Sequence, residues 1–159
     1  MDFTLTDDQR AFADSAQALF ADQCTDEALR AHDVSGAPWR AELWQACVDT
    51  GLHAVVLPEA DGGLGQQMTE LMVVLQAQGQ ALALVPLWEH QLSAAAIARF
   101  GDPALRAAVL PAAAEGRALL TASAAAWLDA RGAGLRLEPA PAGSAAAWHL
   151  HGTAPAVPL

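Results

Sequence analysis

Residues 82–101 read LALVPLWEHQLSAAAIARFG. Pro86 breaks one helix in this stretch, and the alanine-rich run Trp88–Phe100 predicts another, because alanine has the highest helix propensity. Gly101 follows as the stop, and Asp102-Pro103 then places an N-cap residue before a proline at the first position of the next helix. Helices separated by single breaks predict a helical domain.

A second helical stripe precedes this stretch. It starts at Met68 and places apolar side chains at helical spacing, namely Leu71, Met72, Leu75 and Leu82. The glycine-rich loop 61–65 lies before it, after an apolar run that ends at Pro58. The loop has neither the lysine of a P-loop nor the glycine spacing of a dinucleotide-binding turn. We therefore predict a structural turn there.

The N-terminal part also has the pattern of helices. Residues 6–9, TDDQ, form a capping box, and the helix that follows carries Phe12, Ala16, Leu19 and Phe20 on one face. A short helix is predicted from Thr25 to about His32, and Pro38 suits the first position of another. That third helix would stop at Gly51 and present an apolar stripe of Trp39, Leu43, Trp44, Cys47 and Val48.

The pattern changes after Gly116. The helix that starts at Pro103 is expected to run to Leu110, where Pro111 kinks or ends it. Beyond Gly116, strands are expected over Ala118–Ala122, Leu135–Leu137 and Ala147–His151. So few strands leave an unpaired edge, which stable proteins avoid. We therefore expect a helical domain over 1–116 and the start of an incomplete antiparallel β-domain over 117–159, completed by further polypeptide or by another chain.

The composition excludes several classes of function. The 159 residues include 18 acidic and eight basic ones, for a net charge of −10, so that binding to nucleic acid or to an anionic membrane is disfavoured. Hydrophobic residues make up 53%, which is enough for a core, but no apolar run is long enough to span a bilayer. Cys24 and Cys47 fit neither a disulfide framework nor a zinc pattern. These features predict a soluble cytoplasmic protein.

No residue pattern points by itself to a reaction. His149 and His151 share a strand face, but no third metal ligand has a suitable spacing, so no metal site is predicted. His53 lies in an apolar run and is expected to be half-buried and hydrogen-bonded rather than catalytic. Trp88 is expected in the core, although a helix start beside a proline is also a common pocket wall.

Taken together, four stretches resemble the N-terminal part of the acyl-CoA dehydrogenase family. Residues 1–10, MDFTLTDDQR, resemble its opening helix cap. Residues 44–65 resemble its "GL…VPEEYGGLG" segment, residues 82–101 its "LAPVPLLESALAAELLARYG", and residues 148–158, WHLHGTAPAVP, its "WVLDGTKTFVP". The stretches follow the family's order along essentially the whole chain.

The resemblance implies an N-terminal helical domain, a middle β-domain and a C-terminal helical bundle, of which only the first would be complete here. It also implies α,β-dehydrogenation of an acyl-CoA thioester with hydride transfer to FAD, in fatty-acid or steroid side-chain metabolism. The family's catalytic glutamate lies in the C-terminal bundle, so no catalytic residue is assigned to this chain. Homo- or hetero-oligomers with other subunits of the family are also implied.

By this resemblance, Leu84, Trp88 and Leu92 would line the far end of the acyl pocket. The backbone amides of Ala125 and Ala126 would contact the flavin. The family has glutamate and proline at the turn where this chain has Ala126 and Trp127, so no polar side chain remains at that motif. Asp61 and Ala154 likewise replace a tyrosine and a lysine of the family.

These departures leave three hypotheses for the function. The first is an FAD-dependent acyl-CoA dehydrogenase, represented by its N-terminal part. The second is a partner subunit of a heteromeric acyl-CoA dehydrogenase that has lost its flavin site, which the altered turn favours locally. The third is a free-standing helical module that binds a protein or an acyl group. The retained acyl-pocket helix favours the first two.

Overall fold

The computed structural model describes residues 4–123, 135–141, 143–144 and 147–153. Contacts divide the chain into two compact units, the first extending to Leu120 and the second running from Thr121 to Pro158. Each unit is described by itself. The predicted mainly helical fold with a small antiparallel sheet is confirmed.

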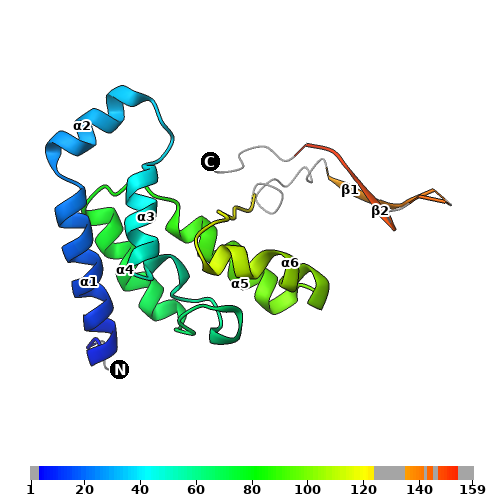
Figure 1. Cartoon of the computed structure of the whole chain (residues 1–159), viewed down its shortest axis with the longest axis horizontal. Helices are drawn as coiled ribbons and strands as arrows, with labels where there is room; N and C mark the ends of the chain where they lie inside the picture. The colour runs from blue at the N-terminus through cyan, green and yellow to red at the C-terminus, as the bar shows by residue number, and fades with distance from the viewer. Residues whose placement is uncertain (1–3, 124–134, 142, 145–146, 154–159) are drawn as a thin grey trace. The chain divides into compact units, whose positions relative to one another are not determined.

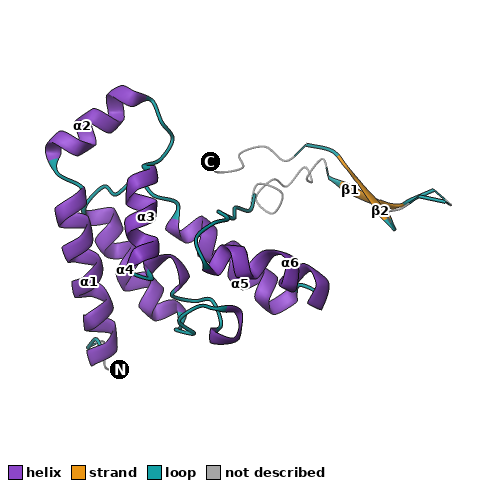
Figure 2. Cartoon of the chain, in the orientation of Figure 1, coloured by secondary structure: helices purple, strands orange, loops and turns teal. Residues whose placement is uncertain are grey.

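The first unit is built from helices (Figures 1 and 2). Its described elements are α1 (Asp7–Gln23), α2 (Asp26–Ser35), α3 (Ala41–Asp49), the short 3-10 helices η1 (Leu52–Ala54) and η2 (Glu59–Asp61), α4 (Met68–Gln80), α5 (Leu87–Phe100) and α6 (Pro103–Ala114). Helix α1 packs along α4 and touches α3, whereas α5 packs against α6 and η1. The candidate site lies where α4 ends and α5 begins.

Local capping signals predicted most helix ends correctly. Thr6 and Gln9 form the expected capping box of α1, and the Asp102 side chain accepts a hydrogen bond from the Leu105 amide at the start of α6. Gly51 follows α3 with a φ of +76°. Pro111 does not end α6, which continues to Ala114.

The start of α3 was predicted wrongly. The helix begins at Ala41 with Arg40 as its N-cap, and Pro38 lies outside it. The Arg40 amide donates to the Leu84 carbonyl at 2.9 Å, and the Arg40 guanidinium donates to the Gln23 carbonyl at 2.6 Å. These contacts with distant parts of the chain hold Arg40 extended, so that the helix cannot start earlier.

The predicted apolar stripes form the core of this unit. The main cluster combines side chains from α1, α3, η1, α4, the start of α5 and the loops between them; its large members include Phe20, Leu43, Trp44, Leu52, Val55, Leu71, Val74 and Leu87. A smaller cluster joins η1 to α5 and α6 through Ala54, Leu57, Ala94 and Leu110. Two predicted members of the α4 stripe are instead exposed, Met72 by 57% and Leu82 by 69%.

The expected strand over Ala118–Ala122 is absent from the described residues of this segment. Here the Trp44 Nε1 donates to the Gly116 carbonyl at 3.1 Å, and the Leu120 amide donates to His90 Nδ1 at 3.2 Å. A strand needs a neighbouring strand for its backbone hydrogen bonds. Side chains of the helical unit already bind this backbone, and the amides of Arg117 and Ala118 donate to the Ala112 carbonyl, so the chain leaves α6 through a turn rather than as a strand.

The second unit contains a hairpin in its described part. Strand β1 (Arg136–Pro139) pairs antiparallel with β2 (Trp148–His151), which confirms the two strands expected there. Leu137 lies opposite Leu150, and Glu138 lies opposite His149, so the ribbon has one apolar and one polar face. The apolar side chains Leu137, Trp148 and Leu150 are all more than half exposed.

Candidate functional site

An open apolar depression of about 340 Å³ lies between the end of α4 and the start of α5. Its lining consists of Leu75, Gln78, Gly79, Leu82, Ala83, Leu84 and Trp88. Two of the three predicted acyl-pocket residues, Leu84 and Trp88, thus share one surface. Leu92 does not line this depression, but it lies one helical turn beyond Trp88 on the same face of α5 and is 44% exposed.

Trp88 lies on the surface of this unit rather than in its core. Its side chain is 46% exposed, so the expectation of a core residue was wrong. Position in a helix shows which residues share a face, but it does not show whether that face packs inside its own unit. The alternative from the sequence, a pocket wall beside Pro86, agrees with the position of Trp88 in the depression.

The turn between α4 and α5 is held by hydrogen bonds to its backbone. Gln78 Nε2 donates to the carbonyls of Ala83 at 3.1 Å and Val85 at 2.6 Å. From the other side, the Arg40 amide donates to the Leu84 carbonyl. These bonds fix the backbone and leave the Leu82 and Leu84 side chains directed outward, with 69% and 47% of their surface exposed.

Sequence reasoning missed Leu82 as a member of this surface. The helical period assigned it to the buried stripe of α4, but α4 ends at Gln80 and Leu82 has a φ of +50°. The sequence signal that was available is the nearby Pro86, because a chain that must leave a helix before a proline needs a turn.

Two histidines of the helical unit, His53 and His90, lie in its interior and do not line this depression. His53 and His90 are 4% and 0% exposed, and Trp44 contacts both rings edge-on. Burial lowers the pKa of His90 to about 4, and the neighbouring His53 adds to this effect. His53 Nε2 lies 2.8 Å from the Ala114 carbonyl and must donate to it, since a carbonyl only accepts. His53 is thus hydrogen-bonded, as predicted, but it is almost completely buried rather than half-buried.

Three side chains thus hold the segment that leaves α6. Trp44 binds the carbonyl of Gly116, His53 that of Ala114, and His90 the amide of Leu120. We call Trp44, His53 and His90 the exit clamp. All three side chains bind the backbone, which is a structural role rather than a catalytic one.

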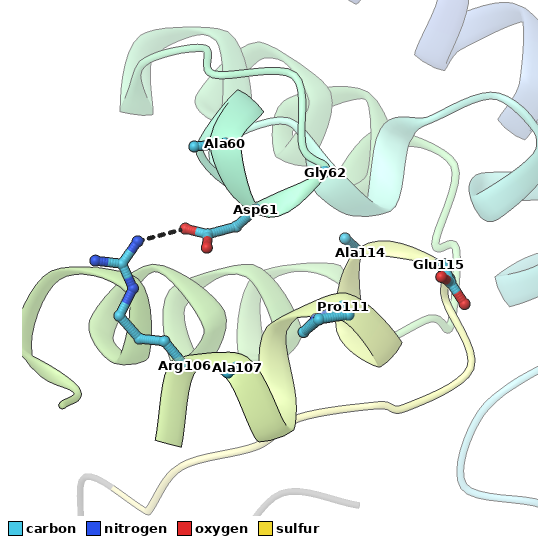
Figure 3. Close-up of a pocket in the computed structure, with 8 residues that line it drawn as sticks. All are labelled: Ala60, Asp61, Gly62, Arg106, Ala107, Pro111, Ala114 and Glu115. Carbon is cyan, nitrogen blue, oxygen red and sulfur yellow. Dashed lines mark hydrogen bonds and ion pairs between the residues drawn. The ribbon is translucent and has the colours of Figure 1, made fainter. Parts of the chain in front are cut away.

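A second depression of about 320 Å³ lies between η2 and α6 (Figure 3). Asp61 and Arg106 face each other across it, with Arg106 Nη2 2.9 Å from Asp61 Oδ2. Asp61 is largely buried, whereas Arg106 is 39% exposed. This ion pair ties the glycine-rich loop to α6, and its two charges compensate each other.

The glycine-rich loop is the structural turn that the sequence predicts. The amides of Leu64, Gly65 and Gln66 donate to the carbonyls of Ala54, Leu57 and Val55, respectively, so the loop folds back on the run before it. A Cβ at Gly63 would lie 2.3 Å from the Leu57 carbonyl oxygen. The glycine therefore permits a close backbone approach rather than ligand binding.

The remaining candidate groups are the metal ligands, the two thiols and the residues predicted to contact the flavin. No group of three histidine, cysteine or acidic side chains there could hold a metal ion. Burial raises the pKa of both free thiols, that of Cys47 to about 12, which makes them poor nucleophiles. Ala125 and Ala126, predicted to contact the flavin, lie outside the described residues. None of the described helices has the length and apolar character to cross a membrane.

Comparison with known proteins gives a consistent result. Residues 6–117 match the family model described as the acyl-CoA dehydrogenase N-terminal domain. Over 107 residues the chain is 36% identical to the acyl-CoA dehydrogenase FadE27 of Mycobacterium tuberculosis. The aligned region covers 67% of this chain and 29% of that protein.

Two similar solved structures cover most of the chain. A variant of the steroid acyl-CoA dehydrogenase Tcur3481-Tcur3483 is 34% identical with a TM-score of 0.82, over 97% of this chain and 42% of that one. The ChsE4-ChsE5 complex from Mycobacterium tuberculosis is 30% identical with a TM-score of 0.78, over 86% of this chain and 37% of that one. The chain therefore spans less than half the length of these relatives. It belongs to the acyl-CoA dehydrogenase family, and its residues 6–117 match the family's N-terminal domain.

Proposed function

We propose that this chain is the N-terminal part of an FAD-dependent acyl-CoA dehydrogenase that introduces an α,β double bond into an acyl-CoA thioester. Membership of the family supports the reaction class. The observation that carries the proposal is the exposed apolar surface of Leu84, Trp88 and Leu92 on this domain. Single exposed apolar side chains are common on folded proteins, but neighbouring ones that form a contiguous patch mark a surface that binds another group.

In this proposal the apolar surface receives the acyl group. Apart from the indole N–H of Trp88, the polar side-chain group in the lining of the depression is the Gln78 amide, and its nitrogen is engaged with two backbone carbonyls. The remaining lining is aliphatic or aromatic, so it offers contact area rather than hydrogen bonds. Trp88 sets the shape of the pocket, because its ring occupies volume that several methylenes of a longer acyl group would need.

FAD, when bound, supplies the hydride acceptor for this reaction. At Ala125 and Ala126 the chain offers only backbone amides, because alanine has no polar side-chain atom. The chain would therefore contribute hydrogen-bond donors to the ring without charge. No residue of this chain is proposed as the catalytic base.

A second candidate is a partner subunit that has lost its own flavin site within a heteromeric acyl-CoA dehydrogenase. The absence of a polar side chain at Ala125 and Ala126 in the sequence favours it. Two of the similar structures are named as two-component proteins, ChsE4-ChsE5 and Tcur3481-Tcur3483. In this candidate the chain would support a partner that holds the flavin.

Purification of the natural gene product from its host distinguishes these candidates. Its visible spectrum reports bound flavin, and reduction of an artificial electron acceptor reports oxidation of acyl-CoA. The panel should contain butyryl-, octanoyl- and palmitoyl-CoA and the CoA ester of a steroid side-chain acid, since one similar structure is a steroid enzyme. About one flavin per chain with acyl-CoA oxidation supports the first candidate. Flavin only with a co-purifying second polypeptide supports the second, and a colourless, inactive monomer refutes both.

A further inference from the structure

Leu82 has an unfavourable backbone conformation and an unfavourable side-chain environment. It is the one residue other than glycine with positive φ in the described part of the chain, at +50°. Left-handed backbone brings the Cβ of an L-residue close to the following carbonyl oxygen, so glycine or asparagine is the usual choice there. The side chain is also 69% exposed.

The turn does not need a leucine at this position. Its hydrogen bonds run between backbone groups, from the Leu82 amide to the Gly79 carbonyl at 3.2 Å and from the Ala83 amide to the Gln78 carbonyl at 3.0 Å, or come from the Gln78 side chain. A glycine would preserve each of them and remove the crowding at Cβ. Here the surroundings enforce a strained conformation, and the leucine makes no hydrogen bond that a glycine would lose. Such a strained position points to a functional side chain.

The Leu82 side chain lines the same depression as Leu84 and Trp88. We propose that Leu82 is a specificity-determining residue of the acyl site, held in the left-handed conformation so that its side chain contacts the acyl group of the CoA thioester. This inference rests on the proposed function. An apolar occupant fits this lining, because its polar side-chain groups are the Gln78 amide and the indole N–H of Trp88 and the rest is aliphatic or aromatic.

The test uses Leu82→Ala and Leu82→Gly in the complete natural protein with its flavin and any partner subunit. Both variants remove the side chain, but only glycine also relieves the backbone. For the preferred acyl-CoA among those larger than butyryl-CoA, kcat/KM should fall roughly tenfold in both, and for butyryl-CoA by less than about twofold. The melting temperature of Leu82→Gly should equal or exceed that of Leu82→Ala.

Leu105→Ala is a matched control, since Leu105 is an exposed leucine of α6 at 44% and does not line the depression. It should leave the acyl profile unchanged. If Trp88→Ala shifts the profile and both Leu82 variants do not, the inference fails while the proposed function stands. If the unaltered protein neither oxidises nor binds any acyl-CoA of the panel, the proposed function fails, and the inference fails with it.

Discussion

Gln91 provides the sharpest test of the packing described above. Its side chain is fully buried on α5, where Oε1 accepts from the Val56 amide at 3.1 Å and Nε2 donates to the Leu52 carbonyl at 3.0 Å. One side chain thereby satisfies two backbone groups of the segment around η1, which has too few residues to satisfy them itself. The perturbation is Gln91→Met, which keeps the length of the side chain and removes both hydrogen-bonding groups.

The expected loss follows from the two backbone groups left without partners. Each buried donor or acceptor that loses its partner costs about 1–3 kcal/mol, and the more apolar methionine returns roughly 1 kcal/mol. The free energy of unfolding should therefore fall by about 3 kcal/mol. Leu52 and Val55 belong to the main core cluster and Ala54 to the smaller one. The loss of these two hydrogen bonds should therefore weaken the packing between the two clusters.

Urea unfolding monitored by circular dichroism measures this change, and hydrogen exchange at the Val56 amide locates it. Gln45→Met is the matched control, because the Gln45 side chain binds Asp49 at 2.8 Å on the exposed face of α3. It should change the unfolding free energy by less than about 0.5 kcal/mol. A loss below about 1 kcal/mol for Gln91→Met, with unchanged exchange at Val56, would refute the reasoning.

Four further predictions follow from single contacts. Trp88→Ala in the complete enzyme should shift kcat/KM roughly tenfold towards longer or bulkier acyl groups, and an unchanged chain-length profile would contradict the pocket role. Glu70 has a lowered pKa, mainly because Gln9 donates a hydrogen bond to it. The stabilisation by the Glu70 carboxylate is therefore present above the unfolded pKa of glutamate and is lost as the pH falls through the lower folded pKa. Glu70→Gln should reduce the fall in melting temperature at acid pH, measured over a series of pH values. His90 has a folded pKa of about 4 against an unfolded 6.5, so stability should decline from pH 6.5 to pH 4 by about 3 kcal/mol, a decline that His90→Phe should abolish in urea titrations at several pH values. Gly63→Ala should lower the melting temperature strongly, because its methyl would meet a backbone oxygen at 2.3 Å, and normal stability would argue against the turn as described.

Signals that act within one turn of helix were readable from the sequence. Thr6 and Asp102 cap helices through bonds to residues three positions away, and the sequence alone shows both partners. Pro38 failed as a helix start because Arg40 is held by the distant Leu84 and Gln23, and no local pattern reports such contacts.

The candidate site was predictable only in part, for a related reason. The spacing of Trp88 and Leu92 shows that they share a face of α5, but it does not show that this face is exposed. The position of the Leu82 side chain in the depression depends on its positive φ, and a leucine in a sequence gives no sign of a positive φ. The resemblance to a family, rather than periodicity, directed attention to Leu84 and Trp88.

The exit clamp has a consequence for sequence variation. Because its rings hold a carbonyl of Ala114 and an amide of Leu120, the bonds themselves do not depend on which side chains those two positions carry. Both side chains also pack against the smaller core cluster, so substitutions at Ala114 and Leu120 that keep size and apolar character should keep both bonds, whereas proline at 120 should lose one because it has no amide hydrogen. Replacing His53 or His90 with a side chain that cannot form its bond should instead lower the stability of the helical unit, so tolerance along this connection depends on the two rings that bind its backbone as well as on its own side chains.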